Sequence, residues 1–431
     1  MKKIVGIVCA VGIVVFLFLA LFPLSASSKD VYEIRLQGAV GPPMADFIDD
    51  AIRKATEDKA EALLILLDTP GGLDTSMRQI IKSILDARIP IIVYVYPQGA
   101  RAASAGAIIL LSAHVAAMAP GTNAGAAHPV SVGKDQADKV MMKKVTQDAE
   151  AYARSLASKR GRNVDWAVKA VRESASITAD EAKNLQVIDV VAENATDLLA
   201  RIDGKIVEVS GTKVQLATKN AKRKTLDMPF KYRFLSYITD PNVAYILMML
   251  GFYGILFEIY SPGAVFPGVI GGICLILAFY AFSTIPISYA GLFLIILGII
   301  FFILELKIAS YGALTIAGIT SIVIGSVMLI DVPSSWLSLS WVSILTVAIL
   351  SMIFFFGVLS YAVKAQLSKV QTGQEGLVGE KGVARTDIDQ SGKVFLHGEL
   401  WNATSDDYIK ANEEVTVVEV RGMTLRVKKG G

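Results

Sequence analysis

The sequence is poor in the residues that usually hold metal ions and disulfides. Its 431 residues include two cysteines and three histidines. Both cysteines, Cys9 and Cys274, lie inside long apolar runs, so the polar segments offer no disulfide and no cysteine-based metal site. The histidines are too scattered for a histidine-rich metal site: His114, His128 and His397. We therefore expect no metal and no cofactor.

Net charge is also small. The 42 lysines and arginines nearly balance 39 aspartates and glutamates, which leaves a formal charge of +3 and gives no argument for a nucleic-acid partner. Apolar residues make up 53% of the chain, more than an ordinary soluble protein contains, so part of the chain is expected to lie in a lipid bilayer. A chain of this length can form two or three domains.

The N-terminus has the pattern of a secretory signal peptide over residues 1–27. Met1-Lys2-Lys3 precedes an apolar run from Ile4 to Phe22, and small residues follow from Ser25 to Ser28. An uncleaved N-terminal anchor is the alternative, because the apolar run is long enough to span a bilayer. In both cases the positive-inside rule keeps the lysines inside, and the chain from about Ser28 onwards is exported.

From Asp30 to about Gly204, short β-patterned runs alternate with amphipathic helical patterns. The run Ala62–Leu67 is continuously apolar, as expected of a strand buried on both faces. Further strands are expected at Val31–Leu36, Ile91–Tyr96 and His114–Met118. This alternation predicts an α/β domain with a mostly parallel sheet over residues 28–217. Loops at the carboxyl ends of such strands are where sites are usually built.

Two loops at strand ends are candidates for a catalytic site. Pro70-Gly71-Gly72 follows one strand, and the turn Gly99–Gly106, which contains Ser104, follows the next. Glycines let the backbone turn sharply, and a serine at a strand-to-helix junction can present its hydroxyl where unpaired helix N–H groups favour negative charge. Donors from both loops could converge into an oxyanion hole. Taken alone, the serine turn is more typical of a packing turn.

A third candidate segment is the helix expected from about Asp138 to Arg160, after a polar loop at Ser131–Ala137. Its apolar stripe has helical spacing and comprises Met141, Val145, Ala149, Tyr152 and Leu156. Lys143 falls on the outer face of this helix, whereas Lys144 falls at the edge of the stripe. Lys144 is therefore the better placed of the two lysines to reach a semi-buried site.

The middle of the chain predicts a linker and a membrane domain. Residues 218–240 begin with the basic run Lys219–Lys224, which we interpret as a solvated connector, with binding to anionic headgroups as the alternative. Five apolar runs follow within residues 241–363, each close to the length that crosses about 30 Å of hydrocarbon. They are Val243–Ile259, Val265–Phe282, Ile287–Leu304, Gly312–Ile330 and Trp341–Ala362. An odd number of spans places the α/β domain outside and the C-terminus inside.

Residues 372–429 form a polar tail of short alternating runs. The runs with strand character are Gly376–Ala384, Gly392–Leu396, Val415–Val420 and Thr424–Val427. They suggest a small β-barrel of about five strands. Such barrels can bind nucleic acid through basic grooves, but this tail is rich in acidic side chains. We therefore expect a protein-interaction module.

Several motifs resemble, in order, those of the ClpP-class serine peptidase domain of long-form NfeD membrane proteins. The matching segments are Leu67–Gly72, Ala102–Gly106, Met118–Thr122 and a lysine helix with Lys144-Val145-Thr146, Tyr152 and Ser155–Ala157. The membrane runs fit the same family, and Gly398–Ala403 and Val420–Gly422 resemble its OB-like C-terminal domain. The resemblance covers essentially the whole chain and implies a ClpP/crotonase-like α/β fold for the first domain.

The resemblance implies a role for each matching residue of the site. By position, Ser104 is the expected nucleophile and Lys144 its general base. The backbone N–H groups of Gly72 and Ala105 are the expected oxyanion donors, and Gly71 shapes the turn. A lysine acts as a base only if its pKa is lowered, and desolvation by the apolar stripe offers that means.

His128 provides a different general base. It stands where the soluble ClpP proteases carry their triad histidine, so a Ser104–His128 pair is an alternative to the pair of Ser104 and Lys144. The non-catalytic interpretation of His128 is a loop histidine that lines the substrate groove or packs against Pro129. The lysine helix favours Lys144.

We therefore predict a membrane-anchored serine endopeptidase that works on the exported side. The resemblance further implies a stomatin-like or flotillin-like partner, hydrophobic peptide segments as substrates, contact with membrane lipid and assembly as a homo-oligomer. A catalytically silent scaffold for the same partners is the main alternative. A crotonase-like enzyme is a second alternative, because that fold also uses backbone N–H groups to hold an oxyanion, although no acyl-CoA site is evident.

Overall fold

The computed structural model describes residues 29–130, 139–260, 265–285, 287–305, 308, 310–330, 338–367 and 374–430. The signal peptide predicted for residues 1–27 lies outside the described residues, as does the loop predicted for 131–137. The chain divides into two units, Met1–Leu350 and Ser351–Gly431.

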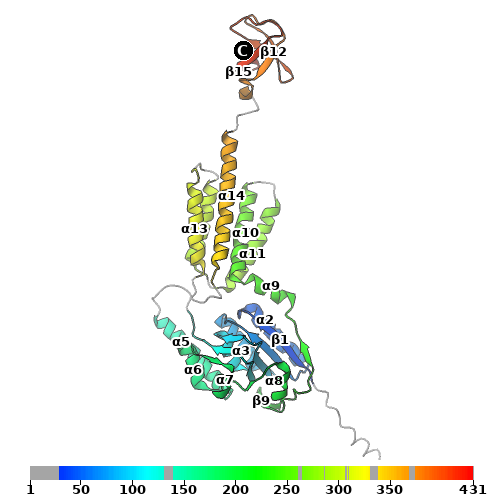
Figure 1. The fold of residues 1–431 in the computed structure, drawn as a ribbon, viewed down its shortest axis with the longest axis vertical. Helices are drawn as coiled ribbons and strands as arrows, with labels where there is room; N and C mark the ends of the chain where they lie inside the picture. Colours follow the sequence, from blue (N-terminus) through cyan, green and yellow to red (C-terminus); the bar gives the residue numbers. More distant parts are fainter. Residues whose placement is uncertain are drawn as a thin grey trace, which may run out of the picture. The chain divides into compact units, whose positions relative to one another are not determined.

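A six-stranded sheet forms the centre of the first domain of the first unit (Figure 1). Its strands are ordered β11-β1-β2-β3-β5-β8, and every ladder between neighbours is parallel. The strand bounds, in that order, are Arg223–Thr225, Val31–Gln37, Ala62–Asp68, Ile91–Val95, Val115–Met118 and Val190–Val191. The side chains of β2 and β3 are almost all buried, as their apolar runs predict. The predicted α/β domain with a parallel sheet is therefore confirmed.

Different elements cover the two faces of this sheet. One face carries the helices α2 Pro42–Glu57, α3 Asp74–Asp86, α4 Ala105–Ser112, α5 Lys139–Lys159, α6 Val164–Arg172 and α7 Ala179–Asn184. The other face carries the helix α8 Ala195–Arg201 and the hairpin of β9 Ile206–Val209 and β10 Thr212–Gln215. Successive side chains of β2 alternate between the two cores, because strand neighbours point to opposite faces.

A second, smaller sheet supports the serine turn. It consists of β4 Arg101–Ala103, β6 Asn123–Gly125 and β7 Ser176–Thr178, with β6 in the middle. β4 and β6 pair in parallel, and β6 and β7 pair in an antiparallel ladder. Three-residue strands show too little alternation to be predicted from sequence. This sheet matters because β4 leads directly into Ser104.

Residues 218–240 are more than the solvated linker that the sequence predicts. β11 adds a sixth strand to the main sheet beside β1, and α9 Phe230–Ile238 packs on α2. The basic side chains contribute to this pairing, since Arg223 lies 3.0 Å from Glu33 and the Lys224 ammonium donates to the Tyr32 hydroxyl at 2.9 Å. The basic side chains are exposed, as the interpretation as a solvated connector expects, but two of these residues also form a strand, because charged residues at a sheet edge can pair with the neighbouring strand.

Five apolar helices occupy the predicted membrane runs. They are α10 Pro241–Tyr260, α11 Val265–Thr284, α12 Tyr289–Glu305, α13 Ala313–Leu329 and α14 Trp341–Leu367. By length and composition, α10 and α11 can each cross a membrane, and the other three contain shorter apolar helices. Small residues let neighbouring helices approach closely: a Cβ added to Gly254 would lie 2.5 Å from the carbonyl oxygen of Pro267. Gly298 and Gly318 make a similar approach between α12 and α13.

The second unit contains a closed five-stranded barrel with the strand order β12-β13-β14-β16-β15. The strands are β12 Lys381–Ala384, β13 Gly392–Leu396, β14 Glu399–Thr404, β15 Glu414–Arg421 and β16 Thr424–Lys429. Its interior is apolar and includes Val394, Val417 and Leu425. The predicted small barrel is confirmed, with β14 as the strand that the sequence patterns did not indicate.

Candidate active site

Ser104 occupies a strained backbone position between β4 and α4. Its φ is 52° and its ψ is −117°, a conformation that residues other than glycine rarely adopt. The Ser104 N–H donates to the Gly125 carbonyl at 2.8 Å, and its own carbonyl accepts from the Ala107 N–H at 3.0 Å. All eight residues of α4 are buried, so the helix cannot relax to relieve this strain. Strain of this kind, about 1–3 kcal/mol, persists where the surroundings fix it and is common at functional sites.

The Gly71 backbone lies directly against Ser104. Gly71 has a φ of +119°, and a Cβ added there would lie 2.6 Å from the Ser104 Cβ and 3.1 Å from its Oγ. Thr69, just before the glycine loop, ties that loop to β4, because its backbone exchanges hydrogen bonds with Arg101 and Ala103. The structure therefore brings together the glycine loop and the serine turn, the two loops that the sequence indicates as candidates.

The backbone N–H groups around Ser104 are mostly engaged. Gly71 donates to the Thr69 Oγ1 at 3.0 Å, and Leu73 donates to the Val40 carbonyl at 2.8 Å. Ala105 is the first residue of α4, so its N–H has no partner one turn earlier in the helix. Gly72 and Ala105 both line the same cavity as Ser104. Their N–H groups are the ones that we expect from the sequence to hold a developing negative charge there.

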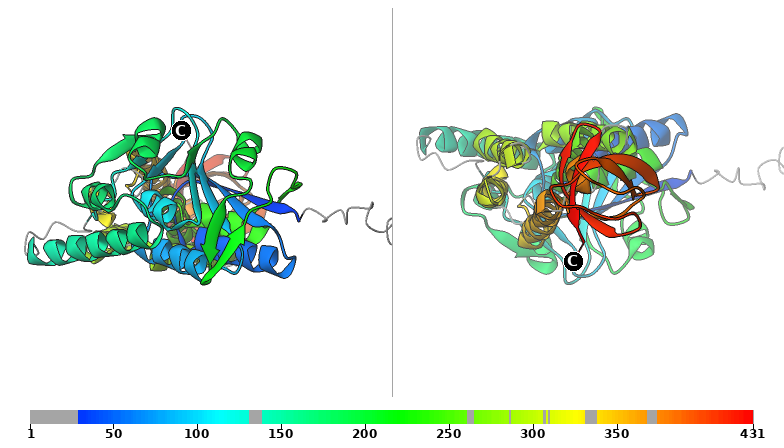
Figure 2. Two further views of the ribbon diagram at one scale, coloured as in Figure 1. Left: turned by 90° about the horizontal axis from the view of Figure 1, so that it is seen from below. Right: turned by 90° about the horizontal axis from the view of Figure 1, so that it is seen from above.

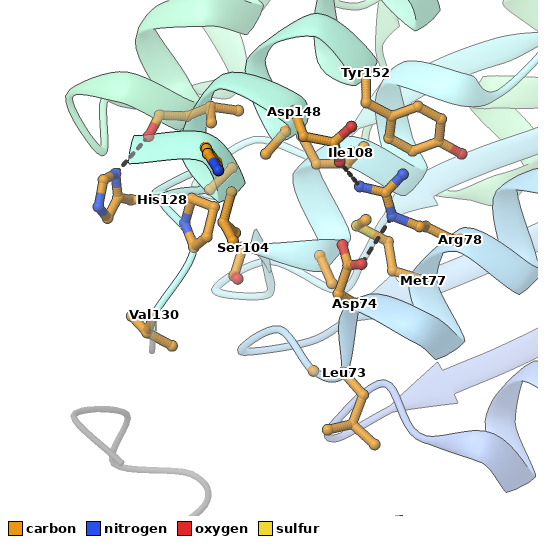
Figure 3. Close-up of a pocket in the computed structure, with 18 residues that line it drawn as sticks. Leu73, Asp74, Met77, Arg78, Ser104, Ile108, His128, Val130, Asp148 and Tyr152 are labelled. Carbon is orange, nitrogen blue, oxygen red and sulfur yellow. Dashed lines mark hydrogen bonds and ion pairs between the residues drawn. The ribbon is translucent and has the colours of Figure 1, made fainter. Parts of the chain in front are cut away.

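A cavity of about 570 Å³ opens over Ser104 (Figure 3). It is walled by the glycine loop, α3, α4, the segment after β6, and α5. Its polar or ionisable lining side chains are Asp74, Arg78, Ser104, His128, Lys144, Asp148 and Tyr152. Ser104, Lys144 and His128, the three side chains that the sequence proposes for proton transfer, thus face one space.

Lys144 is more exposed than the sequence predicts. The apolar stripe of α5 packs only toward its C-terminal end, where Leu156 is buried. Nearer the start of the helix, Met141 and Val145 are 50% and 41% exposed, and the Lys144 side chain is also exposed. Figure 2 shows this part of α5 reaching past the other helices of the domain. The expected desolvation of Lys144 by its own stripe was wrong, because no described segment covers this end of α5.

The His128 side chain is directed toward helix α6. Its Nδ1 lies 2.9 Å from the carbonyl oxygen of Val171 in α6, and the ring is partly buried. In Figure 3 the ring points to that carbonyl and not to the Ser104 hydroxyl. Among the described residues, neither His128 nor Lys144 makes a hydrogen bond to Ser104. A donated Nδ1 proton leaves the Nε2 of His128 as its remaining acceptor.

An arginine network joins the two helices that wall the cavity. Arg78 of α3 donates to Asp74 at 2.8 Å and to Asp148 of α5 at 2.5 Å, and its guanidinium lies 4.6 Å from the centre of the Tyr152 ring. Burial raises the pKa of the Tyr152 hydroxyl. Asp148 lies one turn after Lys144 on the same helix, so Arg78 holds the carboxylate that could otherwise pair with Lys144. This network was not predicted from the sequence, because Arg78 and Asp148 are 70 residues apart.

The framework under Ser104 contains buried charges and a buried histidine. Arg162 donates to the Leu111 and Ala113 carbonyls at the end of α4 and pairs with Asp189 at 2.8 Å. His114 accepts the Ile91 N–H through its Nδ1, and burial lowers its pKa to about 3, so it stays neutral and structural. Among the described residues, no group of three or more His, Cys, Asp and Glu side chains could hold a metal ion.

Three family models match the chain in succession. They are "NfeD1b, N-terminal domain" over residues 30–222, "NfeD integral membrane domain" over 242–360 and "NfeD-like C-terminal, partner-binding domain" over 374–429.

Solved structures of a Pyrococcus horikoshii protease domain also match. One is an alanine variant of the 1510-N membrane-bound stomatin-specific protease in complex with a substrate peptide, which is 38% identical and covers 50% of this chain and 99% of its own, with a TM-score of 0.47. Another is the 1510-N membrane protease specific for a stomatin homolog, which is 36% identical, covers 50% of this chain and 100% of its own, and has a TM-score of 0.43.

Two similar proteins extend over almost the full length. The membrane protein NfeD1b of Bacillus subtilis is 25% identical over 94% of this chain and 94% of its own. The membrane-bound protease PH1510 of Pyrococcus horikoshii is 37% identical over 97% of this chain and 98% of its own. The chain therefore belongs to the family of long-form NfeD membrane proteins with an N-terminal peptidase domain.

Proposed function

We propose that this protein is a membrane-bound serine endopeptidase with Ser104 as its nucleophile. The observation that carries the proposal is the position of Ser104, strained at the start of a buried helix, in contact with the glycine loop and open to the cavity. The protease PH1510, 37% identical over nearly the whole length, supports the same activity. The domain division is proposed as a signal peptide at 1–27, a peptidase domain, a membrane domain and a C-terminal barrel.

In the proposed mechanism, Lys144 is the general base. A neutral Lys144 amine takes the proton of the Ser104 hydroxyl while the oxygen attacks the carbonyl carbon of the scissile peptide bond. The N–H groups of Gly72 and Ala105 hold the negative oxygen of the tetrahedral intermediate. The protonated lysine then gives its proton to the leaving amine, and water releases the acyl group from Ser104 by the reverse sequence.

Two observations favour Lys144 over His128 as the base. The His128 ring points away from the Ser104 hydroxyl (Figure 3). Arg78 binds Asp148 and so leaves Lys144 without a carboxylate that would stabilise its charged form. Lys144 has no ion-pair partner within the described part of the chain, which suits a lysine that must become neutral.

Assembly as a homo-oligomer is proposed to complete the site. Four apolar side chains beside Lys144 are largely exposed: Val130, Val140, Met141 and Val145. Packing of a second copy against them would remove water from the lysine and so favour its neutral form. The mass of the detergent-solubilised chain by light scattering tests this assembly, and a strictly monomeric, fully active chain would contradict it.

The substrates are proposed to be hydrophobic segments of a stomatin-like or flotillin-like protein. The cavity wall includes Leu73, Met77 and Ile108, which suit an apolar peptide. The similar 1510-N membrane protease of Pyrococcus horikoshii is specific for a stomatin homolog. The C-terminal barrel matches a domain described as partner-binding. We propose a ClpP/crotonase-like fold for the peptidase domain and an OB-like fold for the barrel.

Five membrane spans are proposed, with the peptidase domain on the exported side and the barrel in the cytoplasm. Asn242 at the start of α10 accepts hydrogen bonds from the Ser340 N–H at 2.8 Å and the Ser343 hydroxyl at 2.9 Å at the start of α14. The first and fifth helices therefore start on the same side, as five successive crossings require. Labelling of single cysteines from each side of intact cells tests this topology.

Reaction with a fluorophosphonate tests the proposed function. We expect the full-length chain in lipid nanodiscs to be labelled once and to cleave members of an apolar peptide library. Ser104→Ala should lose both reactions, whereas Ser83→Ala, a change on the side of α3 that faces Asp49 of α2 and outside the cavity, should keep them. A folded wild-type chain that captures stomatin-like proteins without labelling or cleavage would favour the alternative, a catalytically silent scaffold.

A further inference from the structure

Helix α9 carries an aromatic face that the described chain leaves uncovered. Phe230, Phe234 and Tyr237 are 73%, 42% and 68% exposed. At the helical period they fall within about 60° of one another around the axis. The rings of Phe230 and Phe234 stack, with their centroids 5.8 Å apart. Large aromatic side chains gathered on one exposed face indicate a contact with something other than water.

The opposite face of α9 is fixed to the peptidase domain. The Tyr232 hydroxyl donates to Asp50 of α2, and this hydrogen bond raises the pKa of Tyr232 to about 12. The Tyr232 ring also meets Phe47, with centroids 6.1 Å apart, and Ile238 is buried. Because these contacts hold α9 on α2, the aromatic face cannot turn inward.

The position of α9 in the chain indicates what covers this face. α9 ends at Ile238, and α10, which is long and apolar enough to cross a membrane, begins at Pro241. Asp240 caps α10 by accepting the Asn242 N–H at 2.9 Å and the Val243 N–H at 3.2 Å. The aromatic face therefore begins at Tyr237, about one helical turn before the point where the chain enters the bilayer, and extends back along α9 to Phe230.

Basic side chains flank the aromatic face. Lys231 and Arg233 are exposed, and the helical period places one on each side of the three rings. Aromatic rings at the level of the headgroups, with long basic side chains beside them, are typical of a helix that lies in a membrane interface. We propose that α9 lies in the lipid headgroup region, with its aromatic face in the outer acyl layer, and holds the peptidase domain against the bilayer.

This docking also bears on how substrate arrives, a point that rests on the proposed function. Leu73 lines the active-site cavity and a second groove of about 350 Å³. The walls of that groove include Pro43, Met44 and Tyr237 of α9. A docked α9 therefore places a groove that adjoins the active site at the membrane surface, so that an apolar segment can reach Ser104 from the lipid side.

Spin labels placed along α9 test the docking. The full-length chain, with both native cysteines replaced by serine, receives one label at a time in nanodiscs that contain anionic lipid. We expect the ratio of oxygen to nickel-chelate accessibility at the three aromatic positions to exceed that at Lys231 and Ser236 by about threefold or more, because oxygen partitions into the acyl layer. Water-accessible labels at all five positions would overturn the proposal. Strong dipolar coupling between labels on two chains would also overturn it, because a second copy would then cover the face.

A charge on the aromatic face tests the functional consequence. Phe234→Asp should lower cleavage of a membrane-embedded segment by about tenfold, the loss of one interfacial aromatic anchor, and leave cleavage of a water-soluble peptide unchanged. Thr225→Asp, which places the same charge on the exposed strand β11, off that face and outside both cavities, should change neither. Equal loss on both substrates would contradict lipid docking as the cause. If the wild-type chain cleaves nothing, the proposed function fails, whereas the spin-label result still decides the docking of α9.

Discussion

Ser104 and Lys144 face the same cavity from very different surroundings. Ser104 is held by a buried helix, a small sheet and a glycine loop, all with fixed hydrogen bonds. Lys144 lies on the part of α5 where the side chains are exposed, before the helix reaches the core at Ala153 and Leu156. The proposed nucleophile is therefore preorganised within one chain, and the proposed base is not.

This difference separates two requirements of catalysis. Positioning a nucleophile and an oxyanion hole needs rigid backbone, which the parallel sheet supplies. Neutralising a lysine needs the removal of water, which an exposed helix end cannot provide alone. We infer that the site becomes competent when substrate or a second copy covers the start of α5. Substitutions around Ser104 and substitutions at the start of α5 should therefore have different effects on stability and activity.

The two ends of α5 offer the largest contrast. Leu156→Ala removes a buried core side chain and should lower the free energy of unfolding by about 2–5 kcal/mol. Val145→Ala removes an exposed one and should change it by less than about 0.5 kcal/mol. Hydrogen exchange of the core strands in nanodiscs measures both. Equal destabilisation would show that the start of α5 is packed after all.

The next largest effect is expected on kcat, for a substitution in the glycine loop that contacts Ser104. Gly71→Ala places a methyl group against the serine and should lower kcat by about 10²–10³-fold, a loss comparable to that of an oxyanion donor, because the methyl group displaces Ser104 from beside the Gly72 N–H. Gly99→Ala is the matched control, because Gly99 also has a positive φ of +84° but a Cβ there meets nothing within 4 Å. An active Gly71→Ala variant would mean that the loop does not shape the site.

The buried framework under Ser104 predicts a pH dependence of the stability. His114 has a folded pKa of about 3, below its ordinary value, so the unfolded chain binds a proton that the folded chain does not. Stability is therefore full above pH 6.5 and falls as the pH drops toward 3, by about 1.4 kcal/mol between pH 7.5 and 5.5. His114→Asn should remove this slope. Hydrogen exchange of β5 at several pH values measures it, and an unchanged slope in the variant would assign the effect elsewhere.

The smallest expected effect concerns Arg78, which joins α3 to α5 across the cavity. Arg78→Met should cost less than about 1 kcal/mol of stability, because its ion pairs are largely exposed. It should lower kcat/KM by up to about fivefold, since α5 loses its tie to α3. Arg53→Met removes an exposed ion pair away from the cavity and serves as the control. A fall in activity for both variants alike would argue against a role of Arg78 at the site.

Much of the framework could be predicted from the sequence, because it follows local periodicity. The buried strands, the helices between them, the apolar helices and the barrel all have clear patterns. The three-residue strands of the second sheet do not, and neither does β11, whose charged residues resemble a linker. These elements form only when distant segments supply their partners.

The candidate site likewise contains residues that could be predicted from the sequence and residues that could not. Ser104 and Gly71 could be placed because their loops follow strands, and the carboxyl ends of parallel strands meet at one edge of a sheet. The exposure of Lys144 could not be predicted, because helical spacing shows which residues share a face and not whether anything covers that face. The Arg78 network was also missed, since Arg78 and Asp148 come from different helices.

The identity of the general base tests the account most directly. The measurement is kcat on one apolar peptide for Lys144→Ala, His128→Ala and, as the matched control, Lys143→Ala, all in the full-length chain. We expect Lys144→Ala to lower kcat by about 10²–10⁴-fold and the other two to stay within about tenfold of wild type. An active Lys144→Ala variant together with an inactive His128→Ala variant would contradict the account and assign the base to the histidine.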